Sequence, residues 1–191
     1  MRRITLLVLL MLGLTAGATA AGAQQAQSPA PAMTAQQQAS RDATREKLRA
    51  LLAVAGPRIN VAFAQSTKNP YNFVGSMTQG LASSASLEIV ISVTKNETIG
   101  FRIYPHYADG YINLDKAKNG PALMRQLLLF SDDNFLFWGA DTTGDIFAGY
   151  TFTLESGFPD AAINVVLSSI RNQDAFVGQM KPQIDGSPAP Q

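Results

Sequence analysis

The chain has 191 residues, of which 46% are hydrophobic, 15% charged and 8% aromatic, and it contains no Cys. This composition excludes collagen-like, low-complexity and disulfide-stapled proteins. Lys and Arg number 15 against 14 Asp and Glu, and they form no basic cluster of the kind that nucleic-acid binding requires. We therefore expect a globular protein held together by packing alone, with no nucleic-acid partner.

The first 23 residues have the pattern of a secretory signal peptide. Two arginines precede an apolar run at 4–14, and small residues follow it, so that Ala20 and Ala23 each end a small-x-small triplet that a signal peptidase accepts. An uncleaved anchor is the alternative, but the run is shorter than the ~20 residues that span a bilayer. We predict a periplasmic or secreted protein with no membrane span after cleavage.

One domain follows the signal peptide. Residues 24–39 have neither charge nor hydrophobic periodicity, and residues 184–191 are rich in Pro and Gly. Segments of this kind bury too little apolar area to offset the entropy lost on ordering. We predict a disordered linker at 24–39, a single α+β domain at 40–183 and a disordered tail at 184–191.

The first half of the domain predicts one helix followed by strands. Ser40 is a suitable N-cap, the apolar residues of 48–55 recur at helical spacing, and Gly56-Pro57 is expected to end the helix. A two-residue period then indicates strands, most clearly a hairpin with a turn at 95–97. The expected strands are 72–77, 87–93, 99–103 and 111–114.

The second half predicts a helix, two strands and a final helix. Pro121 stands in the favoured first turn of a helix that extends to about residue 131. Strands follow at 135–138 and 146–154, then a helix at 158–170, with a turn or short helix at 174–180. The order α-β-β-β-α-β-β-α predicts a two-layer α+β fold, in which an antiparallel sheet of about five strands packs against three helices.

Four segments carry a family resemblance. They read EKLRALLAVAG, TIGFRIYPHY, ALMRQLLLFSDDNFLFWGAD and GDIFAGYTFTLESGFPDAAINVVLSSI. With the order of elements, they resemble the type III secretion chaperone-like superfamily, in particular its bacterial YbjN-like branch. The resemblance implies a non-enzymatic, often dimeric module that binds other polypeptides. Secretion chaperones work in the cytoplasm, so the export signal argues against their role as effector carriers.

The sequence lacks the residue sets of several catalytic chemistries. With no Cys and a single His, His106, it can form neither a cysteine nucleophile nor a Cys/His zinc site. It contains no Gly-x-Ser-x-Gly elbow and no glycine-rich phosphate loop. We interpret His106 as a strand-edge residue bonded to a backbone carbonyl, and the segment 141–145, which faintly resembles a calcium loop, as a hairpin turn. We expect no enzymatic activity, no metal and no cofactor.

A surplus of apolar residues is the positive evidence for a function. The segments 119–131 and 134–138 are apolar on more than one side, whereas a two-layer fold usually leaves one side to water. Either the first and last helices cover the second side, or it forms a homodimer seam or partner groove. The expected partner-binding residues are Leu128, Phe130, Phe135, Phe137 and Trp138.

Two functions fit these observations. The first is an exported interaction module that binds a protein or peptide and forms a homodimer. The alternative is a periplasmic protein that binds a small ligand in a pocket between sheet and helices. The expected lining of that pocket is Tyr104, Tyr107, Tyr111 and Tyr150.

Overall fold

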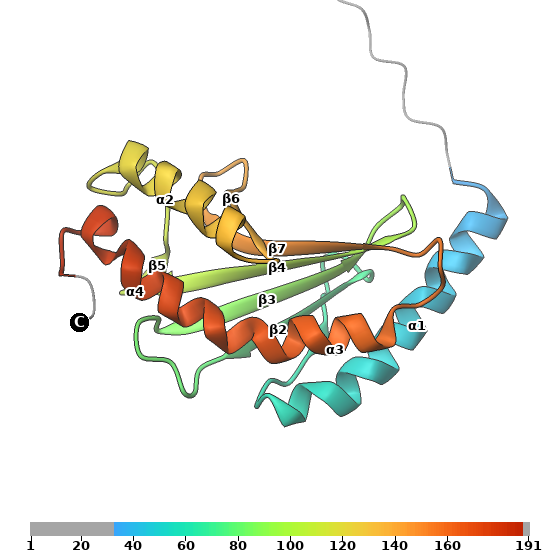
Figure 1. Cartoon of the computed structure of the whole chain (residues 1–191). Helices are drawn as coiled ribbons and strands as arrows, with labels where there is room; N and C mark the ends of the chain where they lie inside the picture. The colour runs from blue at the N-terminus through green and yellow to red at the C-terminus, as the bar shows by residue number, and fades with distance from the viewer. Residues whose placement is uncertain (1–32, 189–191) are drawn as a thin grey trace, which may run out of the picture. The chain divides into compact units, whose positions relative to one another are not determined.

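The computed structural model describes residues 33–188. The expected signal peptide, with Ala20 and Ala23, and the expected linker up to residue 32 lie outside the described residues. The elements in chain order are α1 (Ala35–Arg58), β1 (Ala64–Gln65), β2 (Asn72–Met77), β3 (Ser86–Val93), β4 (Thr98–Tyr107), β5 (Gly110–Tyr111), α2 (Gly120–Asp133), β6 (Phe137–Ala140), β7 (Ile146–Thr153), α3 (Asp160–Ser169), the 3₁₀ helix η1 (Ile170–Asn172) and α4 (Gln173–Ile184) (Figure 1).

The strands form one antiparallel sheet with the order β1-β2-β3-β4-β7-β6, and β5 pairs with β4. The predicted two-layer α+β fold is confirmed. The sheet has seven strands instead of about five. β1 has two residues and is too short to show a period in the sequence. The expected strand at 111–114 is reduced to β5 and to an isolated bridge between Asn113 and Asp145. The helix expected at 158–170 corresponds to α3 and the start of η1, and the turn or short helix expected at 174–180 is the longer helix α4. Figure 1 shows these elements following one another along the sheet.

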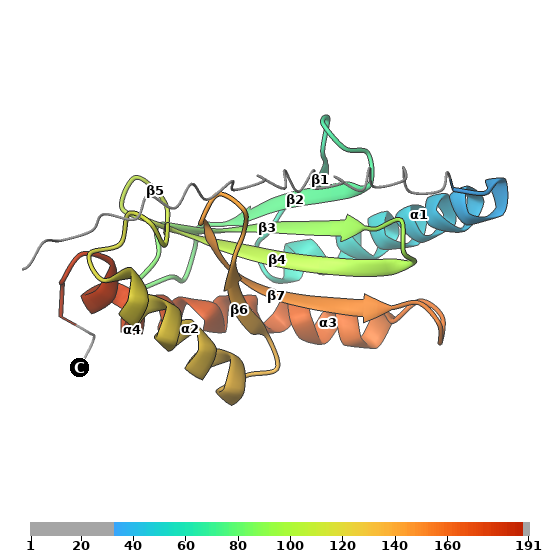
Figure 2. The same ribbon diagram turned by 90° about the horizontal axis from the view of Figure 1, so that it is seen from above.

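The core lies between the sheet and the helices. In β3 and β4 every second residue is buried, and these side chains share one cluster with Leu48 and Leu52 of α1 and with Ile163 and Leu167 of α3. Figure 2 shows β2, β3, β4 and β7 side by side, with α1 passing behind them. The other face of these strands carries no helix from the described part of the chain.

Helix α1 begins earlier than expected. Thr34, not Ser40, is the N-cap, because the Thr34 side chain accepts the Gln37 backbone N–H at 3.2 Å and the Gln37 side chain accepts the Thr34 backbone N–H at 2.9 Å. This reciprocal pair is a capping box. Residues 35–39 of the expected disordered linker are therefore helical.

The C-terminus of α1 is a Schellman motif centred on Asn60. Asn60 has a φ of 58°, its N–H donates to the carbonyl of Pro57 at 3.1 Å, and the N–H of Val61 donates to the carbonyl of Gly56 at 3.0 Å. The helix therefore ends at Arg58, slightly beyond the expected end at Gly56-Pro57. Gly56 instead provides room for the returning chain, because a Cβ there would lie 2.5 Å from the Val61 oxygen.

The returning segment packs on β2 at a second glycine, and replacing it should destabilise the fold. A Cβ on Gly75 would lie 2.5 Å from Val61 Cγ1 and 2.8 Å from Phe63 Cδ1. We expect Gly75→Ala to lower the free energy of unfolding by about 1–3 kcal/mol, the usual cost of overpacking, as measured by urea denaturation. The control is Gly100→Ala on β4, where a Cβ meets no atom within 4 Å. Equal stability of the two variants would contradict this account of Gly75.

Candidate functional site

Helix α2 has one apolar face more than the core can cover. Asn119 caps its N-terminus by accepting the Ala122 N–H at 3.1 Å. Three apolar residues of α2 face the core, namely Leu123, Leu127 and Phe130. Met124 and Leu128, one turn apart on another face, are 51% and 66% exposed. The prediction that this helix is apolar on more than one side is therefore confirmed: one apolar side packs in the core and another is exposed.

A serine of α2 holds β6 against the helix. The N–H of Trp138 donates to Ser131 Oγ at 2.8 Å, and Ser131 Oγ lies 2.8 Å from the Leu127 carbonyl and 3.4 Å from the Trp138 carbonyl. β6 is the edge strand of the sheet. Without Ser131, the backbone N–H and carbonyl of Trp138 that point away from β7 would be free to pair with another strand. Ser131 therefore blocks strand addition at this point of the edge.

Two of the five expected partner-binding residues belong to the core. Phe130 and Trp138 are 2% and 4% exposed, and both rings pack against Phe176 of α4, with centroids 4.7 and 5.9 Å from it. The interpretation of Phe130 and Trp138 as surface contacts is wrong for this conformation. The physical reason is that α4 covers this side of α2 and β6.

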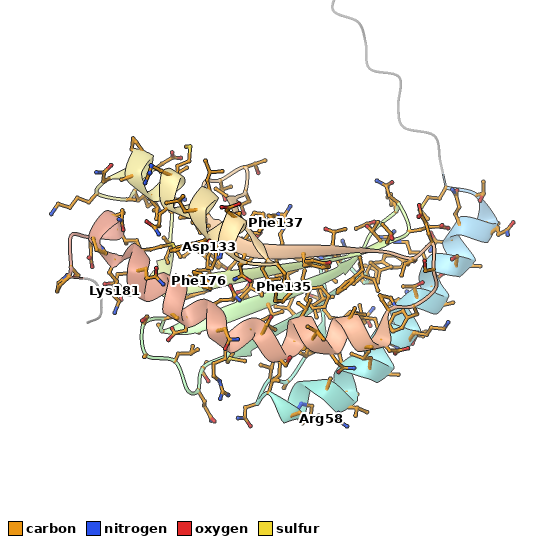
Figure 3. The ribbon with its side chains drawn as sticks, viewed as in Figure 1. Arg58, Asp133, Phe135, Phe137, Phe176 and Lys181 are labelled. Atoms are coloured by element: carbon orange, nitrogen blue, oxygen red, sulfur yellow. The ribbon has the colours of Figure 1, made fainter. Side chains whose placement is uncertain are left out.

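Phe135 and Phe137 lie at the surface, as expected. Both are about half exposed, and Figure 3 shows them near the C-terminal end of α2 that Asp133 marks. Phe137 packs edge-on against Phe147 with centroids 5.8 Å apart. Its ring also packs on Gly149, where an added Cβ would lie 2.7 Å from Phe137 Cζ. Phe135 packs instead against Tyr150, at 6.0 Å.

We call the exposed apolar side chains of α2 and of the segment 135–137 the α2–β6 apolar surface. They are Met124, Leu128, Leu129, Phe135 and Phe137, and they lie on more than one side of the helix and of the strand. Three of its members were expected, whereas Met124 and Leu129 were not. The i, i+4 spacing of Met124 and Leu128 is the signal in the sequence that could have identified Met124. Leu129 has no such signal, because its neighbours along the chain are the exposed Leu128 and the buried Phe130.

The four tyrosines of the alternative pocket do not line one cavity. Tyr104 and Tyr111 pack together with centroids 5.7 Å apart. Tyr107 donates to Asp185 at 2.8 Å near the C-terminus, and Tyr150 packs against Phe152 at 4.8 Å on the helix-covered face. The expected pocket between sheet and helices, as lined by these residues, is not formed.

His106 lies beside Tyr111 and Glu88. Its ring centroid is 4.3 Å from that of Tyr111, and its Nε2 is 3.7 Å from Glu88 Oε2 but makes no hydrogen bond to the described residues. The expected bond from His106 to a backbone carbonyl is therefore not made through this atom. Burial, and then the hydrogen bond that Tyr111 donates to Glu88, raise the pKa of Tyr111 to about 12.

The segment 141–145 is a turn, as the sequence predicts. Asp141 Oδ1 accepts the backbone N–H groups of Thr143 at 2.9 Å and Asp145 at 3.1 Å, and Gly144 has a φ of 81°. Desolvation acts to raise the pKa of Asp141, but these hydrogen bonds hold it below its usual value. Between residues 33 and 188 no group of three or more His, Asp or Glu side chains is placed to hold a metal ion.

The comparisons with known proteins do not identify a family for this chain. No family model, no curated protein and no solved structure matches it. In the segment covered by the structure, no helix is both long and apolar enough to cross a membrane. The resemblance to the chaperone-like superfamily stays a prediction, so the functional argument depends on the surface itself.

Proposed function

We propose that this protein is an exported, non-enzymatic interaction module that binds another polypeptide, in the first instance a second copy of itself, through the α2–β6 apolar surface. The observation that carries the proposal is Leu128, a leucine 66% exposed in the middle of a well-formed helix. Apolar side chains next to aromatic residues are typical of the centre of a protein interface.

The exposed face of α2 is suited to pairing with itself. Pro121, Arg125, Leu128 and Asp132 are all exposed and follow one another at intervals of 4, 3 and 4 residues, which places them in one stripe of the helix. In a twofold dimer each contact occurs twice. Two antiparallel α2 helices that meet at Leu128 would place Arg125 of one copy opposite Asp132 of the other. Apolar contact would then coincide with charge complementarity.

A charge at the centre of this stripe should dissociate the dimer. We expect light scattering to give the mass of two chains for the purified protein and of one chain for Leu128→Glu, with dimer affinity reduced at least about tenfold, or ~1.4 kcal/mol. Circular dichroism should be unchanged, because Leu128 makes little contact with the core. The matched control is Val165→Glu on α3, where the replaced side chain is 58% exposed and outside the surface.

A charge exchange tests the antiparallel arrangement. Arg125→Glu should weaken the dimer through two like-charge contacts, and Arg125→Glu with Asp132→Arg should restore it, because the pairing is the same with the signs exchanged. A monomeric parent protein would overturn the proposed homodimer. A dimer that Leu128→Glu and Val165→Glu affect equally would overturn the assignment of the surface.

A further inference from the structure

The sheet face away from the helices has a hollow at its centre. The hollow has a volume of about 500 Å3 and crosses β2, β3, β4 and β7. Ser92, Gly100 and Thr151 are register partners on three adjacent strands and form its floor, and Asn72 continues the row on β2. A Cβ built on Gly100 would meet no atom within 4 Å. The hollow therefore exists because small residues occupy one row of the sheet.

A single cation stands at the side of this hollow. The Arg102 guanidinium lies over the Phe147 ring, 4.6 Å from its centroid, and donates one hydrogen bond, 3.2 Å long, to Tyr104 Oη. Among the described residues no carboxylate lies within 4 Å of it. Since a guanidinium has five N–H donors, Arg102 is held in place by the aromatic ring while most of its donors have no partner in the described chain.

The remaining lining is part polar and part apolar, because Val90 and the ring of Tyr104 lie beside the polar groups. Hydroxyl groups come from the floor and from Thr98, an amide comes from Asn72, and the half-exposed Phe137 stands at the edge. Arg102 is the only formally charged residue of the lining. Two acids lie near the Tyr104 end of the hollow: Glu88 accepts the Tyr111 hydroxyl at 2.9 Å, and Asp141 accepts the Tyr104 hydroxyl at 3.4 Å. The hollow thus combines one positive charge, several hydroxyl groups and apolar surface from Val90, Tyr104 and Phe137.

We propose that this hollow binds a small hydroxylated carboxylate, of the sugar-acid class. The planar fork of Arg102 matches a carboxylate, the hydroxyl and amide groups of the floor match the ligand hydroxyls, and the Phe137 ring offers a surface for the C–H face of a sugar. A phosphate carries nearly two charges and is usually held by several cations or by backbone N–H groups. One guanidinium on the face of a sheet, where the backbone N–H groups are used in pairing, suits a carboxylate better.

An NMR titration of the purified protein with glucuronate tests the proposal. We expect saturable shifts at Ser92, Gly100 and Thr151. The binding of glucuronate should weaken at least tenfold in Arg102→Gln. Neutral methyl glucoside and inorganic phosphate are the competing ligands, and both should bind at least tenfold more weakly than glucuronate.

Two glycine substitutions distinguish the loss of binding caused by a filled hollow from the loss caused by an unfolded protein. Gly100→Val should fill the hollow and remove glucuronate binding without loss of stability. The matched control is Gly110→Val on β5, where an added Cβ also meets no atom within 4 Å and where binding should persist. Absence of saturable shifts, equal binding of methyl glucoside or phosphate, or unchanged binding in Gly100→Val would each overturn the proposal. Phe137 belongs both to the hollow and to the α2–β6 apolar surface. The titration is therefore repeated with Leu128→Glu, in which glucuronate binding should persist whether or not the parent protein is a dimer.

Discussion

Replacing Asp174 with Ala should lower the free energy of unfolding by about 3 kcal/mol, as measured by urea denaturation. Asp174 stands in the first turn of α4 and is 6% exposed. Its carboxylate accepts the backbone N–H groups of Ala82 at 2.6 Å, Ser83 at 3.0 Å and Ser84 at 2.7 Å. Hydrogen bonds to a charged group contribute about 1.5–3 kcal/mol each. Ala82 is exposed and Ser83 and Ser84 are half-buried, so water replaces part of this contribution in the variant.

The same carboxylate should make stability depend on pH in the acid range. Desolvation acts to raise the pKa of Asp174, but the hydrogen bonds from residues 82–84 outweigh it and hold the pKa below its usual value. The unfolded chain therefore binds this proton first as pH falls. The stabilisation is present in full well above about pH 4, the ordinary pKa of an Asp side chain, and is lost as pH falls through the lower native pKa.

Asp174→Asn separates this carboxylate from the other acids of the chain. The variant should be less stable at neutral pH and should lose less stability between neutral pH and the acid range. Asp109→Asn, at an exposed position in the β4–β5 turn, is the matched control and should retain the full acid dependence. If both variants lose the same stability at every pH, the loop at 82–84 is not held by the charge of Asp174.

The central part of the fold is predictable from the sequence because its signals are local. All seven apolar positions assigned to the predicted hairpin are buried, from Leu87 on β3 to Ile103 on β4. The contact between Asp174 and residues 82–84 joins segments about ninety residues apart, and no pattern in the sequence announces it. The N-cap at Thr34 is a different case, because the capping box of Thr34 and Gln37 is visible in the sequence but lies in a segment that resembles a linker.

The candidate site was predictable in its place but not in its orientation. Apolar runs in the sequence predict α2 and β6. The sequence cannot distinguish Phe130 from Phe137, because both are phenylalanines in these runs, and it is the position of α4 that covers Phe130 and leaves Phe137 exposed. Phe176, whose ring packs against Phe130 at 4.7 Å, is outside both runs. The hollow at Gly100 was missed for a related reason, since a row across four strands combines residues that are far apart in the chain.

Replacing Trp138 with Ala should destabilise the protein by about 3–5 kcal/mol, as expected for removal of a large aromatic side chain from a core. The indole packs against Phe130 at 6.0 Å and Phe176 at 5.9 Å, so its removal would leave a cavity under α4. Phe135→Ala, at a half-exposed position three residues away, should cost much less. Urea denaturation of both variants measures the difference.

Trp138 is the single tryptophan of the chain, so the fluorescence of the parent protein provides an independent test of its burial. Its emission should be that of an indole in an apolar environment, and should move to longer wavelength only on unfolding. Trp138→Phe should retain most of the stability, because it keeps an aromatic ring and removes an indole N–H that has no hydrogen-bond partner among the described residues. A small cost for Trp138→Ala, combined with loss of the dimer, would instead place this side chain in the interface. Because burial under α4 and contact with a second copy cannot both apply to one indole, this pair of measurements decides between the core and the α2–β6 apolar surface.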